Sequence, residues 1–215
     1  MPSTFGKLQS PVIPQIIATA LGVAKSAAKS PSCSRFVYTS SSSAVAEPNP
    51  GVVRTVTEDT FNEQVVVDAY SENLPGGIVG GHTVSASGET KAEQALWKWY
   101  RETDPSFTLN VEWFCDVKDV SRLHLGALLL PETNSERVFA YAGRYTINDI
   151  LSAFRNLCPG KGFPDDVAGV KPDSTKVPNA RSTELLDLLG LPGWTTLQGS
   201  LGPLTKQWSE LEPAT

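Results

Sequence analysis

The chain has 215 residues, a formal net charge of −5 and an isoelectric point near 5.1, enough for one domain with a hydrophobic core. Its acidic balance argues against nucleic acid and anionic membrane as partners, because no basic patch is present to neutralise phosphates. Three scattered cysteines and two histidines predict neither a disulfide framework nor a metal site. With no leader and no apolar stretch expected to span a bilayer, the predicted location is cytoplasmic.

The first predicted element is an amphipathic helix over residues 12–28, whose apolar side chains recur every three or four residues. It ends before Pro31, because proline disfavours helix at the residue that precedes it. A short apolar strand over 36–39 follows. The remaining predictions are helices over 57–66, 90–100, 119–130, 147–157, 182–189 and after Gly193, strands over 107–110 and 137–141, and a loop over 73–81. Strands alternating with helices predict an α/β fold with a mostly parallel sheet.

Four serines, residues 40–43, follow the predicted strand 36–39. In parallel sheets, side chains at the carboxyl ends of strands face the edge where ligands bind. The pattern therefore predicts a site at this strand end. A serine-rich loop after an ordinary core strand is the alternative.

A run of glycines over residues 76–81 is the second candidate motif. It lacks the Gly-x-Gly-x-x-Gly spacing of dinucleotide loops and does not directly follow a predicted strand. We expect a flexible connector here and not a phosphate-binding loop.

Two aspartates, Asp116 and Asp119, flank the predicted start of a helix. A carboxylate there accepts hydrogen bonds from free backbone N–H groups and complements the helix dipole, so both are predicted to cap the helix. His124, one turn further on, is predicted to be a packed histidine and not a catalyst.

Short segments along the chain, in this order, resemble the fungal branch of the extended short-chain dehydrogenase/reductases. The segments are residues 12–15, 35–42, 90–97, 114–120, 123–124, 137–140, 148–151 and 193–197. That branch comprises dihydroflavonol-reductase-like aldehyde and ketone reductases that use NADPH. The resemblance covers nearly everything from Val12 onward.

The resemblance implies an α/β fold made of a partial Rossmann-type parallel sheet with a C-terminal helical substrate lobe. Residues 1–110 correspond to an incomplete dinucleotide-binding region and residues 111–215 to the substrate lobe. Compared with the family, the chain looks truncated at its N-terminus, without the Gly-rich first unit, and internally deleted after Asn110. NADP is the implied cofactor, although the loop that would bind its pyrophosphate is missing.

The family's catalytic groups map onto three positions of this chain. A serine at the strand end binds the substrate carbonyl, which corresponds to Ser41, with Ser42 as a nearby alternative. A tyrosine and a lysine four residues later on one helix normally form the proton relay, in which the cation lowers the phenol pKa. Counting back from Trp97, these two positions hold Ser85 and Glu89. As an N-cap serine and a first-turn acid, the same pair has a purely structural interpretation.

Two functions therefore follow from the sequence. The first is an NADP-dependent oxidoreductase that reduces the carbonyl of a small metabolite, in secondary metabolism by family association. The second is a truncated, non-catalytic relative that binds a full-length homologous protein.

Overall fold

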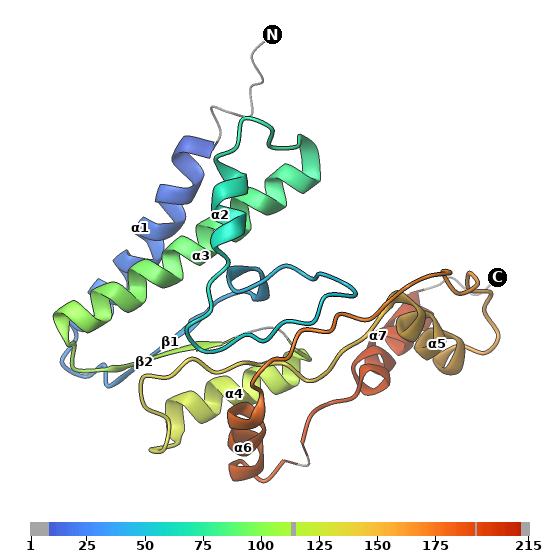
Figure 1. Cartoon of the computed structure of the whole chain (residues 1–215). Helices are drawn as coiled ribbons and strands as arrows, with labels where there is room; N and C mark the ends of the chain where they lie inside the picture. The colour runs from blue at the N-terminus through green and yellow to red at the C-terminus, as the bar shows by residue number, and fades with distance from the viewer. Residues whose placement is uncertain (1–8, 113–114, 192, 212–215) are drawn as a thin grey trace.

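A parallel sheet of two strands lies at the centre of the computed structural model, which describes residues 9–112, 115–191 and 193–211. Strand β1 (Arg35–Thr39) pairs with β2 (Thr108–Glu112), and Arg35 lies opposite Thr108. The helical elements are α1 (Gln9–Ala28), η2 (Ser42–Ala44), α2 (Glu63–Ala69), α3 (Gly77–Thr103), α4 (Val117–Leu129), α5 (Ile147–Leu157), α6 (Ala180–Leu188) and α7 (Leu197–Leu211). Helices α1 and α3 lie on one side of the sheet and α4 on the other (Figure 1). The predicted α/β fold is confirmed.

Side chains of β1 alternate between two helical layers, as the period of a strand requires. Phe36 and Tyr38 point toward α1 and α3, where they pack against a cluster that includes the buried Leu96 and Phe107. Arg35 and Thr39 point the other way, toward α4: the Arg35 guanidinium donates to the Ala127 carbonyl (3.1 Å) and Thr39 contacts His124. Both faces of the strand are thus used, as is usual for parallel sheets.

Helix α3 begins much earlier than the predicted helix 90–100, so the prediction of a loop through residue 81 was wrong. Gly80 explains why glycine is needed in its first turn, since a Cβ there would lie 1.9 Å from the Pro75 carbonyl oxygen. Further along, Gly88 lets α1 approach closely, because its Cβ would meet the end of the Ile16 side chain at 2.4 Å. Packing against α1 and α2 therefore outweighs the low helix propensity of the glycines.

The second hydrophobic core lies below the sheet, around α4 and α6. Leu123 of α4 packs there with Leu185 and Leu186 of α6 and with the fully buried Val138 and Phe139. The segment around these last two residues was predicted to be a strand, but no strand appears there among the described residues. Its apolar residues are buried in this core.

The C-terminal part of the chain is helical, and α5 and α7 pack against each other at one end of the molecule (Figure 1). Helix α5 has the predicted bounds 147–157. A capping box fixes its start: Thr146 and Asp149 exchange hydrogen bonds between side chain and backbone. At α2 the prediction was less accurate, because Asn62 caps that helix through the Val65 amide (3.2 Å) and residues 57–62 are not helical.

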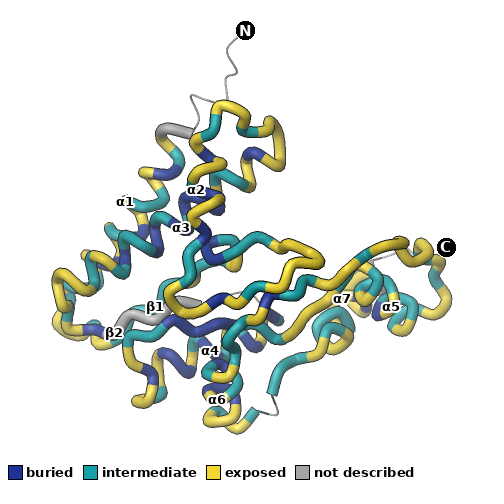
Figure 2. Tube along the Cα trace, in the orientation of Figure 1, coloured by how far each residue is buried: buried dark blue, intermediate teal, exposed yellow. Residues whose placement is uncertain are grey.

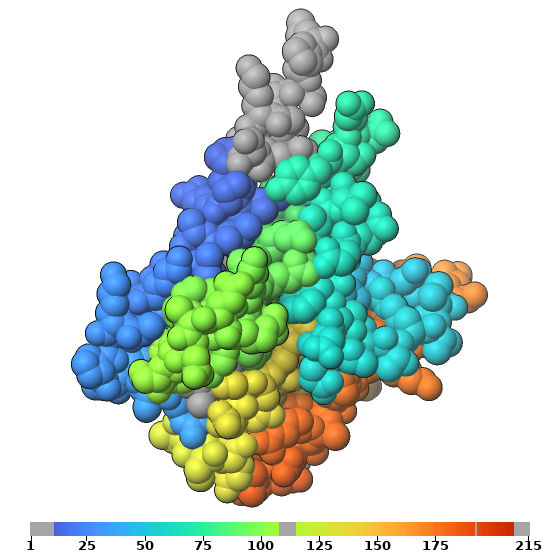
Figure 3. Space-filling model, turned by 60° about the vertical axis from the view of Figure 1, so that its left-hand side comes forward, coloured from blue at the N-terminus to red at the C-terminus, as the bar shows by residue number. Residues whose placement is uncertain are grey.

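Helix α1 corrects one prediction about apolar stretches. Its residues Pro11–Ala28 are long and apolar enough to cross a membrane by length and composition, a test that core helices and signal sequences also pass. Only 17% of these residues are buried, and α1 shows mostly half-buried and exposed residues along its length (Figure 2). In the space-filling view it lies beside the C-terminal part of α3 (Figure 3).

Candidate functional site

The candidate site lies where β1 ends. Ser41 is the N-cap of η2, with an extended backbone (φ −121°, ψ 153°), and its hydroxyl accepts a hydrogen bond from the Ser43 amide (3.2 Å). The Ser41 hydroxyl also lies near the carboxyl group of Glu89 on α3, whose pKa it lowers. The structure therefore brings together two predicted site residues that lie far apart in the sequence. Ser42, the alternative, is exposed.

Glu89 and Ser85 occupy successive turns of α3; Glu89 is half-buried, whereas Ser85 is exposed. Burial raises the pKa of Glu89 above its usual value, since it disfavours the charged carboxylate. The Ser41 hydroxyl and the nearby His82 oppose this shift in pKa, whereas the negative charge of Glu47 adds to it. The carboxyl group therefore keeps its proton to a higher pH than an exposed glutamate. The described residues offer the Ser85 hydroxyl no hydrogen-bond partner.

His82 and Glu47 form the outer rim of this site. His82 lies in the second turn of α3, and its Nε2 atom is 3.1 Å from a carboxylate oxygen of Glu47. About half of each side chain is exposed to solvent. The pair thus lies between the half-buried Glu89 and bulk water.

Tyr38 of β1 also lies near the site, and Ser42, not a lysine, stands four residues after it. Its pKa is raised, first by burial and then by the negative charges of Glu93 and Glu89. A lysine would have the opposite effect on a phenol. Tyr38 therefore faces the site as a neutral phenol that resists ionisation.

A buried ion pair lies directly behind the serines. The carboxylate of Glu93, one turn after Glu89, is 2.6 Å from Nε of Arg137 and accepts a hydrogen bond from Ser40 (2.8 Å). Trp97 Nε1 also donates to Glu93 (3.3 Å), and the Arg137 guanidinium lies over the Phe61 ring at 4.4 Å. Because the two charged residues are distant in sequence, no local pattern predicts this pair.

The aspartates near the start of α4 divide their roles. Asp116 caps the helix as predicted, accepting from the Lys118 amide (2.8 Å). Asp119 was predicted to cap the same helix, but it bonds to a different segment. Its fully buried carboxylate accepts hydrogen bonds from the backbone amide (2.7 Å) and the hydroxyl (3.0 Å) of Thr195. This contact ties α4 to the segment that precedes α7.

His124 is held on both ring nitrogens. Its Nδ1 is 2.8 Å from the Val120 carbonyl, which only accepts, so Nδ1 carries the proton and Nε2 accepts from the Thr39 hydroxyl (2.8 Å). Thr39 points to the α4 side of the sheet, away from Glu89. The geometry agrees with the prediction of a packed histidine.

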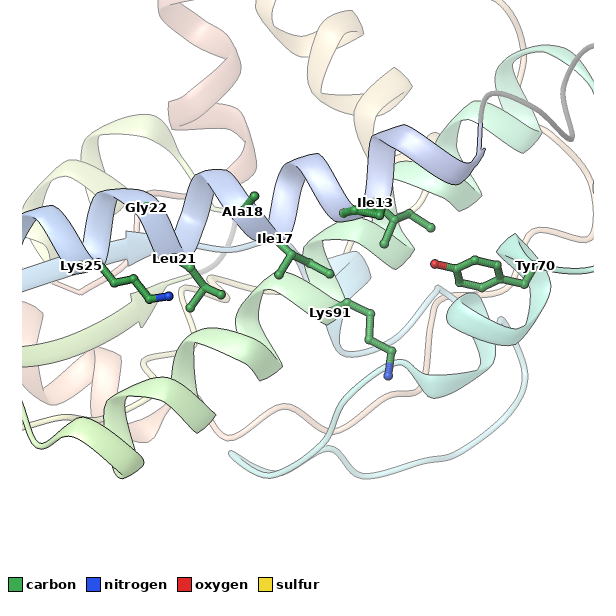
Figure 4. Close-up of a pocket in the computed structure, with 9 residues that line it drawn as sticks. Ile13, Ile17, Ala18, Leu21, Gly22, Lys25, Tyr70 and Lys91 are labelled. Carbon is green, nitrogen blue, oxygen red and sulfur yellow. The ribbon is translucent and has the colours of Figure 1, made fainter.

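An open pocket of about 630 Å³ lies elsewhere, between α1, α2 and α3 (Figure 4). Ile13, Ile17 and Leu21 form its apolar wall, and Lys91 and Tyr70 lie at its rim. Lys91 is paired with Glu63 (3.3 Å). None of the predicted site residues lines this pocket.

The site around Ser41 fits only part of the cofactor that the resemblance implies. Ribose hydroxyls donate hydrogen bonds to carboxylates, so Glu89 and Ser85 suit the neutral ribose. Phosphate groups need cations or free N–H groups, and Glu89 supplies negative charge where a lysine is expected. Around Ser41, the described residues thus match the ribose and not the pyrophosphate.

Comparisons with known proteins agree with the sequence resemblance. No family model matches the chain. Aldehyde reductase 2 of Sporidiobolus salmonicolor is 29% identical over 245 aligned residues, covering 94% of this chain and 71% of that protein. The NAD-dependent epimerase/dehydratase terH of Aspergillus terreus is 27% identical and covers 92% of this chain and 70% of its own length. Because the first alignment is longer than this chain, that relative contains stretches that the chain lacks.

Solved reductase structures share the fold. Yeast methylglyoxal/isovaleraldehyde reductase Gre2, complexed with NADPH, has a TM-score of 0.65 at 17% identity and covers 91% of this chain and 70% of its own. Vestitone reductase from alfalfa has a TM-score of 0.66 at 16% identity and covers 93% and 72%. The sequence of the chain is thus similar to that of an aldehyde reductase and an epimerase/dehydratase, and its fold is similar to that of solved reductases, in agreement with the resemblance to the extended short-chain dehydrogenase/reductases.

Proposed function

We propose that this protein reduces the carbonyl group of a small metabolite, an aldehyde or a ketone, with NADP(H) as the cofactor. The relatives named above include an aldehyde reductase, and ketoreductase adrE of Penicillium rubens matches 63% of the chain at 29% identity. The observation that carries the proposal is the packing of α3 against η2, which places Glu89 near Ser41 at the strand end. It supports a site in which the serine at the strand end lies close to the helix position that holds the catalytic lysine in the family.

Ser41 would orient the substrate. Its hydroxyl donates a hydrogen bond to the carbonyl oxygen, which fixes the carbonyl and stabilises the negative charge that develops on oxygen during reduction. Bound cofactor would supply the hydride that adds to the carbonyl carbon. Ser85 and Glu89 are the groups at this site that would meet its ribose.

The setting is part of the same proposal. We place the protein in the cytoplasm and, by association with its relatives, in secondary metabolism. A dinucleotide-binding part over residues 1–110 and a substrate lobe over 111–215 complete the proposed organisation. The proposed substrate lobe contains α4, α5, α6 and α7.

A second candidate function is a non-catalytic relative that binds a homologous protein. Ser85 and Glu89 favour it, since an aliphatic hydroxyl and an anion replace the phenol and cation of the family's proton relay. The raised pKa of Tyr38, caused first by burial, points the same way, because no tuned phenol replaces the missing one.

Turnover of the full chain separates the two functions. We expect NADPH oxidation with a panel of aldehydes and ketones, and a fall in kcat/KM of about a hundredfold in Ser41→Ala, since one hydrogen bond to the developing oxyanion is lost. Ser42→Ala is the matched control and is expected to leave turnover unchanged. The reductase function would be ruled out if the protein showed no turnover and no change in nicotinamide fluorescence at millimolar NADPH. Co-elution with a full-length homologue in size-exclusion chromatography would then support the second candidate.

A further inference from the structure

We propose that Arg54 and Arg144 form a binding site for the anionic group, a carboxylate or a phosphate, of a small molecule. The two arginines lie far apart in the sequence, and both donate hydrogen bonds to Thr175. Nε of Arg54 is 2.8 Å from the Thr175 hydroxyl oxygen, and Nη2 of Arg144 is 3.0 Å from the Thr175 carbonyl oxygen. This site goes beyond the reductase function and does not depend on it.

Two segments that are distant in the sequence hold the cluster together. Thr55 and Lys176 form an isolated parallel bridge, in which the Lys176 amide donates to the Arg54 carbonyl (2.8 Å) and the Val56 amide donates to the Lys176 carbonyl (3.0 Å). In Figure 1 the loop that leads to this bridge lies beside the segment that precedes α6. Thr175 is only 5% exposed, so the residue on which both arginines converge is held firmly in the fold.

The positive charge of this cluster exceeds its negative charge. Neither arginine forms an ion pair with any of the described residues. Asp173 is the acid of the same segment, but its carboxylate accepts from the amide (3.0 Å) and the hydroxyl (2.8 Å) of Thr175. Lys171 and Lys176, both exposed, add further positive charge to this segment. Such a concentration of one sign of charge attracts an ion of the other sign.

Both guanidinium groups have N–H groups left for a ligand. Arg54 donates to Thr175 and to the Glu47 carbonyl, and Arg144 donates to Thr175, so neither uses all the donors of its guanidinium. The planar fork of a guanidinium matches the oxygens of a carboxylate or a phosphate. Because the bonds to Thr175 already orient both forks, binding costs less side-chain entropy.

The cluster is accessible from solvent. Arg144 is exposed and Arg54 is half-buried. The Glu47 carbonyl that accepts from Arg54 belongs to the residue whose carboxylate pairs with His82 (3.1 Å). A small molecule can therefore reach both guanidinium groups directly, close to the backbone at the rim of the candidate site.

Equilibrium binding to the full chain tests this site. Malonate and inorganic phosphate are the probes in isothermal titration calorimetry, with ionic strength held constant by sodium chloride because salt screens exposed charges. We expect saturable binding of at least one probe, and a rise in its Kd of about tenfold in Arg144→Gln, since hydrogen bonds to a charged group are lost. The probe that binds more tightly identifies the anionic group as a carboxylate or a phosphate.

Arg101→Gln is the matched control, because it makes the same change in net charge at an exposed arginine in the last turn of α3. Its Kd should equal that of the unsubstituted chain. Arg54→Lys keeps the charge but removes the fork, so it should also weaken binding. In nitrogen NMR, the Nε resonances of Arg54 and Arg144 should shift during the titration with the Kd from calorimetry, and that of Arg101 should not.

A purely structural role, in which the two arginines only tie segments to Thr175, gives different results. Equal Kd values for Arg144→Gln and Arg101→Gln, or no saturable binding of either probe at constant ionic strength, would overturn the anion site. Loss of binding in Arg144→Gln with an unchanged thermal unfolding temperature would support it. None of these outcomes depends on turnover, so the reductase function is tested separately.

Discussion

Glu93 and Arg137 place opposite charges in the interior, with side chains 0% and 3% exposed. Removing such charges from water costs several kcal/mol per ion, which attraction offsets only when further hydrogen bonds are made. Ser40 and Trp97 donate to Glu93, and Arg137 donates to the backbone carbonyls of Glu58 and Thr60. The pair is therefore stable as a complete set, and it fixes the backbone next to Ser41.

Removing one charge of the Glu93–Arg137 pair should lower the stability of the protein. Glu93→Gln leaves Arg137 buried without its counter-ion, so we expect the free energy of unfolding to fall by about 3 kcal/mol in urea titrations. Glu102→Gln removes an exposed carboxylate 3.9 Å from Lys98 and should change it by less than about 1 kcal/mol. Equal effects of the two substitutions would contradict the structural role of the buried pair.

Among the elements, α3 shows most clearly where sequence patterns fail to predict secondary structure. Apolar periodicity correctly predicted α1 and α5, since each presents one apolar stripe. The glycines at the start of α3 predicted a loop, because the packing of this helix against α1 and α2 cannot be recognised from local sequence. Likewise, Val138, Phe139 and Ala140 are buried although they do not form one of the named strands, which composition alone does not distinguish from a strand.

Two adjacent glycines of α3 test this explanation. Gly80→Ala should lower stability by more than about 1 kcal/mol, because its Cβ would collide with the Pro75 backbone. Gly81→Ala meets nothing within 4 Å and has an ordinary helical φ, so it should raise stability by about 0.5–1 kcal/mol through helix propensity. Thermal unfolding by circular dichroism measures both; destabilisation by Gly81→Ala would show that this turn is not helical in solution.

The site was predictable only in part. The family resemblance pointed to Ser41, Ser85 and Glu89, and their catalytic roles stay predictions. The proximity of Ser41 and Glu89, the position of His82 beside them, and the charges around Tyr38 depend on how α3 packs against η2. No local pattern encodes distances between residues that meet only after folding.

At the scale of the whole molecule, Asp119 makes a polar contact that connects distant segments of the chain. Its carboxylate is 0% exposed and receives two hydrogen bonds from Thr195, on the segment between α6 and α7. Arg122 supplies a third (3.1 Å). The contact joins α4, beneath the sheet, to the C-terminal helices.

Asp119→Ala should therefore release the segment around Thr195. We expect faster cleavage near residues 193–197 in limited proteolysis and a loss of about 2 kcal/mol in stability, since buried donors lose their acceptor. Asp116→Asn keeps an N-cap acceptor at the start of the same helix and should leave the cleavage rate unchanged. Equal protection of Asp119→Ala and the unsubstituted chain would contradict the anchoring role.

The pairing of Arg35 with Thr108 has a consequence for the site as well as for the sheet. If β1 slipped by one residue, every side chain would exchange faces, and the Arg35 guanidinium would enter the aromatic cluster that now holds Phe36 and Tyr38. The serines would rotate with the strand, so Ser41 would turn toward α4 and lose Glu89. Correct strand registration and an assembled site are thus a single event in the folding of this chain.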